Sequence, residues 1–280
     1  MKVILTLFVV LMGVAPVQAQ IARQRASTKP KPLVLFETQN IGAQSTVDVL
    51  PRQNLNMTIM HTFGIVTEKP LNNFFGFDFG PNVRLGFDYG ITDSWTVGIG
   101  RSSREKVVDF RTKFAVLKQT DTGSIPLSIT LKGDLGITTV ENGLDVIDKM
   151  SFLSSAIFAR QFNEHLVVQL SPMYAHFNTV FDEGDPNDYL ALGVAAQYRF
   201  NMRYAVFFES YPALTEMAPG SKNAFTVGLD LGTGGHVFQL FLTSSPLHTE
   251  QYVLYQTTDD FWAGDFRFGF NVNRLFGLKH

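Results

Sequence analysis

Apolar and polar residues alternate one by one along much of this chain. The clearest case is residues 82–103, where apolar side chains occupy every second position on both sides of a short Thr-Asp-Ser segment. The apolar positions are Val83, Leu85, Phe87 and Tyr89 before that segment and Trp95, Val97 and Ile99 after it. A period of two residues is typical of a strand with one apolar face, and the turn between two such runs predicts a β-hairpin.

The same pattern recurs after Pro51 and predicts twelve strands. Their expected ranges are 55–63, 83–90, 95–101, 107–119, 127–136, 150–162, 166–178, 189–200, 204–211, 225–232, 236–243 and 264–276. Most of these lengths suit strands that cross a bilayer at a tilt, for which about 9 to 11 residues are needed. Two strands fit less well. Residues 150–162 are apolar or small on both faces, and Pro172 lacks the N–H of a paired residue, so we expect a β-bulge at Pro172.

Short and long connections alternate between these strands. The short ones are residues 92–94, 120–126, 163–165, 201–203 and 233–235, and the long ones are 64–82, 137–149, 179–188, 212–224 and 244–263, with 102–106 as a brief exception. Tight turns on one side and long loops on the other, with an even number of strands, are typical of transmembrane barrels. The sequence therefore predicts an all-β fold, a closed antiparallel up-and-down transmembrane β-barrel of about 12 strands.

The polar faces of the strands would line the lumen of this barrel, and their apolar faces, rich in Phe, would meet lipid. Ten charged residues fall on the polar faces: Arg84, Asp88, Asp109, Arg111, Lys113, Lys132, Asp134, Glu209, Asp230 and Arg267. A buried charge without a partner costs several kcal/mol, so these groups must be paired or solvated. Because five are positive and five negative, we expect a structural ion-pair network rather than a selectivity ring, which would show an excess of one sign.

Composition agrees with a membrane barrel and limits the partners and metal sites that the chain could have. Aromatic residues make up 13% of the chain and charged residues only 17%. A net charge of −2 gives no electrostatic argument for nucleic acid, and the absence of Cys excludes disulfides and thiolate metal sites. A soluble, secreted lipid-binding barrel, with its apolar faces inside, is the alternative to the membrane reading.

The N-terminal residues precede the barrel and divide into three parts. Residues 1–19 combine Lys2, an apolar run and small residues before a cut after Ala19, which is typical of a cleaved signal peptide. Residues 20–32 form a basic arm, expected to be a flexible linker or a docking arm for a periplasmic partner; its charges are Arg23, Arg25, Lys29 and Lys31.

The rest of the 20–54 lead-in leaves three alternatives open. Val34, Phe36, Val47 and Val49 are expected to be half-buried. They fit an extra strand, a plug in the lumen or a simple lead-in to the barrel at 55–276, which residues 277–280 follow as a tail.

Several segments of this chain are similar to one known family. They are Asn-Val-Arg-Leu-Gly-Phe-Asp-Tyr-Gly-Ile-Thr-Asp at 82–93, Val-Gly-Ile-Gly-Arg-Ser-Ser at 97–103, Ile-Phe-Ala-Arg-Gln-Phe-Asn at 157–163, Gly-Gly-His-Val-Phe-Gln-Leu at 234–240 and Phe-Gly-Phe-Asn-Val-Asn-Arg at 268–274. Over about residues 33–276 the chain resembles bacterial outer-membrane-type β-barrel proteins grouped as a domain of unknown function. The resemblance implies a barrel in the outer membrane of a Gram-negative cell, and it brings no activity, substrate or catalytic residue.

Candidate chemistry in the sequence is sparse, so we expect no enzyme, no catalytic residue, no cofactor and no metal site. The six histidines are scattered, and no two have a His-x-x-x-His spacing. His176-Phe177-Asn178 is the nearest pattern to the Ser, His and Asn of outer-membrane phospholipase, but the surrounding motif is missing. The acidic residues 182–188 could attract Ca²⁺, although they do not have EF-hand spacing and an ordinary solvated loop is expected.

The leading functional hypothesis is a narrow transport or ligand-passing barrel. Its long loops carry aromatic residues that would close one mouth or capture a ligand: Phe74, Phe75, Phe77, Phe79, Tyr252, Tyr255, Phe261 and Trp262. The alternative is a structural or docking barrel with a sealed lumen and no transport. Expected partners are outer-membrane lipid, a small-molecule solute and a periplasmic protein at the basic arm, with no nucleic acid.

Overall fold

The computed structural model describes residues 29–79 and 81–278, and the chain from Lys31 onward forms one compact unit. The expected signal peptide at residues 1–19, and Arg23 and Arg25 of the basic arm, lie outside the described residues.

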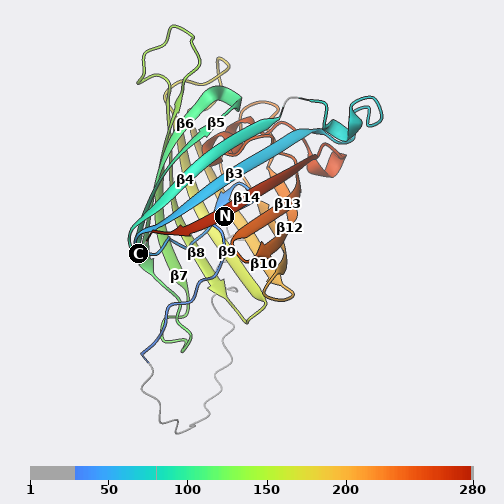
Figure 1. The fold of residues 1–280 in the computed structure, drawn as a ribbon. Coiled ribbons are helices and arrows are strands. Elements are labelled where there is room, and N and C mark those ends of the chain that lie inside the picture. The colour runs from blue at the N-terminus through green and yellow to red at the C-terminus, as the bar shows by residue number, and fades with distance from the viewer. Residues whose placement is uncertain (1–28, 80, 279–280) are drawn as a thin grey trace. The chain divides into compact units, whose positions relative to one another are not determined.

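Twelve antiparallel strands form a closed barrel (Figure 1). They are β3 (Asn54–Ile65), β4 (Asn82–Thr92), β5 (Trp95–Ser102), β6 (Val107–Leu117), β7 (Ser128–Thr138), β8 (Met150–Gln161), β9 (Leu166–Phe177), β10 (Asp188–Arg199), β11 (Tyr204–Ser210), β12 (Phe225–Thr233), β13 (His236–Thr243) and β14 (Arg267–Gly277). Each strand pairs with the next one along the chain, and β14 pairs with β3 to close the ring. The predicted twelve-stranded up-and-down barrel is confirmed.

The expected bulge at Pro172 is wrong. Strand β9 keeps one register with β10 across Pro172, and its register with β8 is the same before and after this position. The Pro172 side chain points to the exposed face of the sheet, so the missing N–H interrupts the pairing with β8 without shifting it. The predicted strand 150–162, which also fitted less well, forms the regular strand β8 over Met150–Gln161.

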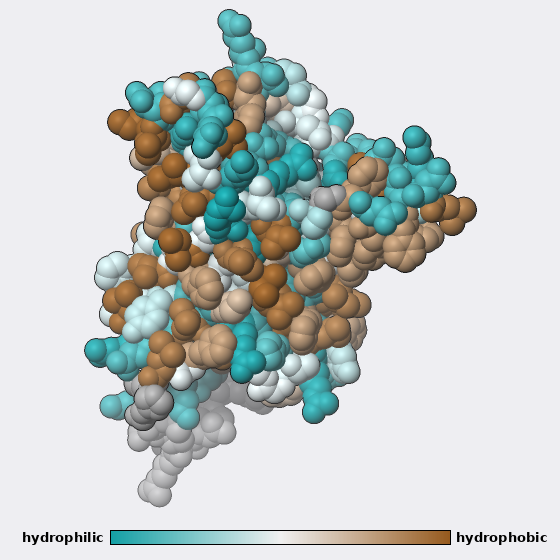
Figure 2. Space-filling view, turned by 45° about the horizontal axis from the view of Figure 1, so that its top comes forward, coloured by the Kyte–Doolittle hydropathy of each residue, from teal (hydrophilic) through white to brown (hydrophobic). Residues whose placement is uncertain are grey.

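Most apolar side chains of these strands point outward and most charged side chains point inward. Phe87 and Phe110 are each 43% exposed and Leu229 is 47% exposed, whereas Asp109 and Lys113 are almost fully buried. Figure 2 shows apolar residues spread over the side of the barrel that faces the viewer, with hydrophilic residues gathered toward its ends. This facing is the reverse of that in a soluble barrel with an apolar core.

The barrel has a turn end, with the short connections, and a loop end, with the long ones. Strand β3 begins and β14 finishes at the turn end. The connections at the loop end contain four short helices: η1 (Phe74–Gly76), η2 (Arg104–Lys106), α2 (Glu250–Gln256) and η3 (Phe261–Ala263). None of the helices in the described residues is long and apolar enough to cross a membrane.

Candidate functional site

Residues 33–53, which we call the plug, fold into the lumen instead of adding a strand to the wall. They contain β1 (Asn40–Ile41) and β2 (Gln44–Ser45), two short strands that pair around Gly42 and Ala43. From Leu35 to Leu50 every residue except Glu37 and Asp48 is buried. Of the three alternatives for this segment, the structure therefore shows a plug. Val34 is 68% exposed, so its expected half-burial is wrong: it precedes the point at which the chain enters the lumen.

Both limbs of the plug leave the lumen at the turn end. On the incoming limb, the Leu33 N–H donates to the Gln119 carbonyl at 2.8 Å, beside the turn between β6 and β7. On the outgoing limb, the Arg52 N–H donates to the Asp93 carboxylate at 2.9 Å, in the turn between β4 and β5. The plug is therefore a hairpin inserted from one side, and it does not run through the barrel.

Polar side chains from seven strands hydrogen-bond to the plug. They are Thr96 on β5, Arg111 and Lys113 on β6, Thr130 on β7, Gln169 on β9, Arg199 on β10, Glu209 on β11 and Asn271 on β14. The tip of the plug is the most closely held part. The Glu209 carboxylate accepts the N–H groups of Ala43 and Gln44 at 2.9 and 2.7 Å, and Asn271 donates to the Gly42 carbonyl at 2.8 Å.

Apolar packing adds to these hydrogen bonds. Four plug residues, Leu35, Phe36, Ile41 and Val47, form one cluster with inward-facing wall residues that include Ile157, Val167, Phe207 and Phe241. Burying a side chain of this size contributes about 1.5 to 3 kcal/mol. Apolar packing as well as hydrogen bonds therefore holds the plug in the lumen.

The connection between β13 and β14 closes the lumen from the other end. Residues 244–257, which we call the mouth loop, include α2 and are almost entirely buried. Tyr252 and Tyr255 lie inside, at 3% and 2% exposure. The His248 Nε2 atom lies 3.2 Å from the carbonyl oxygen of Asn82 at the start of β4.

The plug and the mouth loop meet inside the barrel at Glu250. Its carboxylate accepts the Ser45 N–H at 3.0 Å and the Ser45 hydroxyl at 3.1 Å, and it forms an ion pair with Lys132 of β7. Burial favours the neutral form of Glu250, but the positive charges of Lys132 and Arg111 outweigh it and hold the pKa of this carboxyl below its usual value. A single charged junction therefore links the wall, the plug and the mouth loop.

Nine of the ten charged residues expected in the lumen are buried, and Arg267 is half-buried at the loop end. Five of them lie together on β4, β6 and β7. Arg84 binds Asp109 with Nε 2.9 Å from Oδ1, and Asp134 lies 2.5 Å from Lys132 Nζ and 3.6 Å from Arg111 Nε.

The other five expected lumen residues form no ion pair with this group. Glu209 holds the plug tip, and Lys113 donates to Gln39 and to the Asp48 carbonyl, both in the plug. The remaining three bind other parts of the structure: Asp230 accepts from Gln197 and Gln239, Arg267 pairs with Asp259, and Asp88 lies beside Gly98.

Sequence reasoning missed several residues of this site. Glu250 lies in a loop without periodicity, and no local signal marks it as a lumen residue. The neutral amides Gln169 and Asn271 are different, because they occupy the polar phase of β9 and β14 and could have been identified from the alternation.

The candidate catalytic pattern at 176–178 does not form a catalytic group. The His176 ring lies on the outer side of the barrel with Nδ1 2.7 Å from the Asp188 carboxylate, whereas the Asn178 amide donates to the Ile147 carbonyl. Across residues 29–79 and 81–278, no three His, Asp or Glu side chains are grouped as metal ligands.

The aromatic loop residues divide between the two faces of the rim. Tyr252 and Tyr255 close the mouth, but Phe74 and Phe75 are 62% and 45% exposed and do not. The loop that carries them folds outward, and the Phe77 ring packs on Phe63 of the outer wall at 4.6 Å between centroids. Their expected role in closing the mouth is therefore wrong for this loop.

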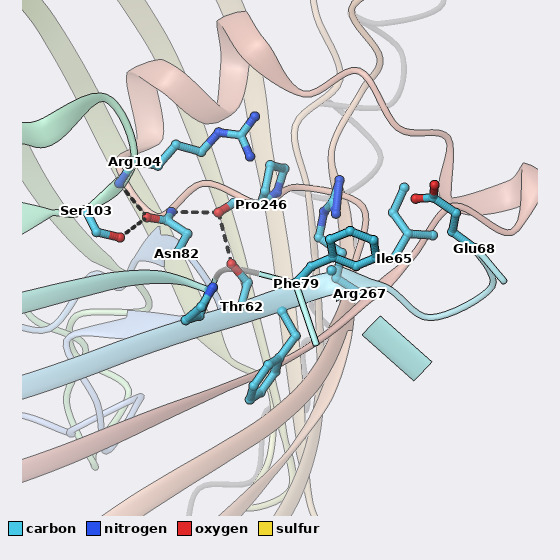
Figure 3. A pocket seen from close by; sticks show the side chains of 12 residues that line it. Thr62, Ile65, Glu68, Phe79, Asn82, Ser103, Arg104, Pro246 and Arg267 are labelled. Carbon is cyan, nitrogen blue, oxygen red and sulfur yellow. Dashed lines mark hydrogen bonds between the residues drawn. The ribbon is translucent and has the colours of Figure 1, made fainter. Parts of the chain in front are cut away.

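A cavity of about 530 Å³ opens at the loop end, beside the closed lumen (Figure 3). It is bounded by the ends of β3, β4 and β14, by the connection between β5 and β6, and by Pro246 of the mouth loop. Thr62 and Asn82 both donate to the Pro246 carbonyl, at 3.0 and 2.7 Å. A second cavity, of about 290 Å³, lies beside Phe177 and Tyr252.

A closed ring with an apolar exterior and a polar, filled interior defines a transmembrane β-barrel. The chain belongs to the family described as Membrane bound beta barrel domain (DUF5777), whose model matches residues 36–276 and so includes most of the plug. The family resemblance expected from the sequence is confirmed. Comparison with curated proteins gives no match.

Comparison with solved structures finds similarity to outer-membrane barrels at low sequence identity. The chain is similar to the NanC porin, with a TM-score of 0.51 and 8% identity over 79% of this chain and 98% of that one. For the KdgM porin the values are 0.48 and 7% over 81% and 99%, and for an outer membrane channel from Pseudomonas putida F1 they are 0.47 and 12% over 82% and 98%. At such identities the likeness to NanC concerns the fold alone.

Proposed function

We propose that this protein is a narrow solute channel of the Gram-negative outer membrane, exported by a cleaved signal peptide, and that the structure is its closed state. The turn end then faces the periplasm and the loop end faces outward. Membership of a membrane-bound barrel family and the porin-like fold support this proposal.

The observation that carries the proposal is the chemistry of the wall behind the plug. Glu209, Gln169 and Asn271 bind the plug through hydrogen bonds that water can replace, each contributing about 0.5 to 1.5 kcal/mol net, or more where the group is charged. When the plug withdraws, this wall remains polar and becomes hydrated. A lumen that is wettable without its plug is what a gated channel requires.

A sealed docking barrel is the second candidate, and one observation favours it. The plug also buries Leu35, Phe36 and Ile41 against the wall, and this apolar contact is lost to water on withdrawal. If the free energy lost with these contacts exceeds the free energy that any opening stimulus supplies, the lumen stays closed.

Single-channel conductance separates these two functions. Gln44→Cys with Gly193→Cys places one thiol on the plug and one on β10, because the Gln44 side chain reaches the space beside Gly193. The oxidised pair is recorded only after peptide mass analysis has shown the disulfide. The natural chain has no Cys, so only this pair can react. The tip-release variant combines Glu209→Ala and Asn271→Ala, which free the tip of the plug, with Glu250→Ala, which removes the charged junction that holds the mouth loop to the plug and to Lys132.

We expect rare openings in the unmodified protein, frequent openings in the tip-release variant, and none in the oxidised cysteine pair until a reductant is added. The reduced cysteine variant is the matched control. A tip-release variant that shows faster hydrogen exchange in both the plug and the mouth loop but no current would contradict the channel and favour the docking barrel.

A further inference from the structure

We propose that the cavity of about 530 Å³ at the loop end binds a small hydroxylated anion through the guanidinium groups of Arg104 and Arg267. Its volume lies within the range of roughly 300 to 1,000 Å³ usual for small-molecule sites.

The wall of the cavity is formed before any ligand arrives. The Asn82 side chain donates to the Pro246 carbonyl and accepts the Ser103 hydroxyl at 3.1 Å and the Arg104 N–H at 2.9 Å (Figure 3). One amide therefore joins β4, the β5–β6 connection and the mouth loop, and it fixes the backbone from which the Arg104 side chain extends. Preformed geometry lowers the entropic cost of binding.

The arginines of this cavity have unused donors. Within the described residues the Arg104 side chain makes no hydrogen bond and no ion pair with another residue. Arg267 pairs with Asp259, but its Nε is buried without a partner. A guanidinium presents a planar set of donors that matches a carboxylate or phosphate, so an anionic oxygen group can satisfy both arginines.

Two other lining residues narrow the class of anion. The Glu68 carboxylate makes no hydrogen bond to the rest of the described structure, so it can accept a ligand hydroxyl, and its charge disfavours multiply charged anions. The Phe79 ring is 44% exposed and offers an apolar face. A monoanion with hydroxyl groups and one apolar face fits this combination better than an inorganic ion.

This inference rests on the proposed function only in naming the anion as the solute that enters the channel. Binding itself requires no opening of the lumen, because the cavity lies outside the plug and the mouth loop closes the lumen behind it.

The test uses the full chain in a neutral detergent and three solutes of similar size. Glucuronate, glucose and glucosamine carry a negative charge, no charge and a positive charge, and their binding is followed by calorimetry. We expect glucuronate to bind at least ten times more tightly than the other two. Arg104→Gln should weaken its binding about tenfold or more. The matched control is Arg101→Gln, which removes an exposed arginine three residues away that does not line the cavity.

Equal binding of the three solutes, no binding of glucuronate, or an unchanged affinity in Arg104→Gln would overturn the inference. Glucuronate binding by a protein that never conducts would leave the site standing and contradict the channel. Conductance by a protein that binds glucuronate no more tightly than glucose would support the channel and contradict the anion site.

Discussion

Gly42 determines how closely the tip of the plug fits against the barrel wall. Its φ of +59° lies in the left-handed region, which costs other residues about 1 to 2 kcal/mol. A Cβ at this position would also overlap the carboxylate of Glu209. That carboxylate binds the next two N–H groups of the plug, so a side chain at Gly42 disturbs the central contact of the tip.

Gly42→Ala should therefore loosen the tip of the plug by about 2 to 3 kcal/mol, from the backbone conformation together with the displaced Glu209. Hydrogen exchange of residues 40–47 measures this change. Gly143→Ala is the control, because Gly143 also has a positive φ, +77°, but nothing within 4 Å of an added Cβ. Protection of residues 40–47 equal in the two variants would contradict the fit described for Gly42.

For single residues, the sequence predicts which face of the sheet a side chain takes, but it does not predict which residues that side chain contacts. Alternation identified Glu209 and Lys132 as lumen residues because a strand fixes which face each residue takes. It could not identify their partners in the plug and mouth loop, since neither segment repeats a period. Val34 shows the same limit, because an apolar residue next to a buried segment can still face water.

Among the elements, the mouth loop depends most on pH. Burial lowers the pKa of the His248 imidazole to about 3, and the nearby positive charge of Arg84 acts in the same direction, against the hydrogen bond to the Asn82 carbonyl. The charge of His61 acts in the same direction as that of Arg84. His248 is therefore neutral in the buried loop.

The sign of the pH effect follows from that lowered pKa. The buried loop is fully stabilised above pH 6.5, the usual pKa of histidine, and loses stability as the pH falls from there toward about 3. The Glu250 carboxyl, with a pKa below its usual 4.5, acts in the same direction but only below pH 4.5. Of these two groups in the mouth loop, only His248 changes charge between pH 6.5 and 4.5.

We expect the hydrogen-exchange protection of α2 to fall by up to about tenfold per pH unit in this window, since one pKa unit corresponds to about 1.4 kcal/mol. His248→Gln should remove the slope, because the amide can still donate to Asn82 without titrating. Strand β7 serves as the internal control. A slope that persists in His248→Gln would assign the effect to another group.

The strands were the most predictable elements, and the segments inside the ring were the least. Nearly every strand boundary was predicted to within two residues, because each strand has one face in an apolar phase and one in a polar phase. The plug instead contacts both polar and apolar wall residues on all sides. The positions of Phe36 and Val47 therefore show no alternation by which a plug could be told from a strand. The start of β14 was placed three residues early, at Gly264, because Phe266 shares the apolar phase of Phe268 and Phe270 although it precedes the strand.

For the whole molecule, the two tryptophans mark opposite edges of the apolar exterior. Trp95 begins β5 at the turn end and is 41% exposed, and Trp262 lies in η3 at the loop end and is 78% exposed. Trp residues gather at the level of lipid headgroups, where an apolar ring can keep its N–H in a polar layer.

In bilayers, both tryptophans should be quenched more strongly by lipids brominated near the headgroup than by lipids brominated at the chain centre. Trp95→Phe and Trp262→Phe each leave one emitter and separate the two edges. Trp95 fluorescence that no brominated lipid quenches would contradict a membrane-spanning orientation with the turn end at one surface.

The way in which the plug enters the barrel limits how the closed state can end. Because both limbs of the plug leave at the turn end and both ends of the mouth loop join strands at the loop end, neither insert is threaded through the ring. Each can retract toward its own compartment while the β3–β14 seam stays intact. The lumen is thus closed separately at each end. Opening it requires that both the plug and the mouth loop move, each from its own side of the membrane.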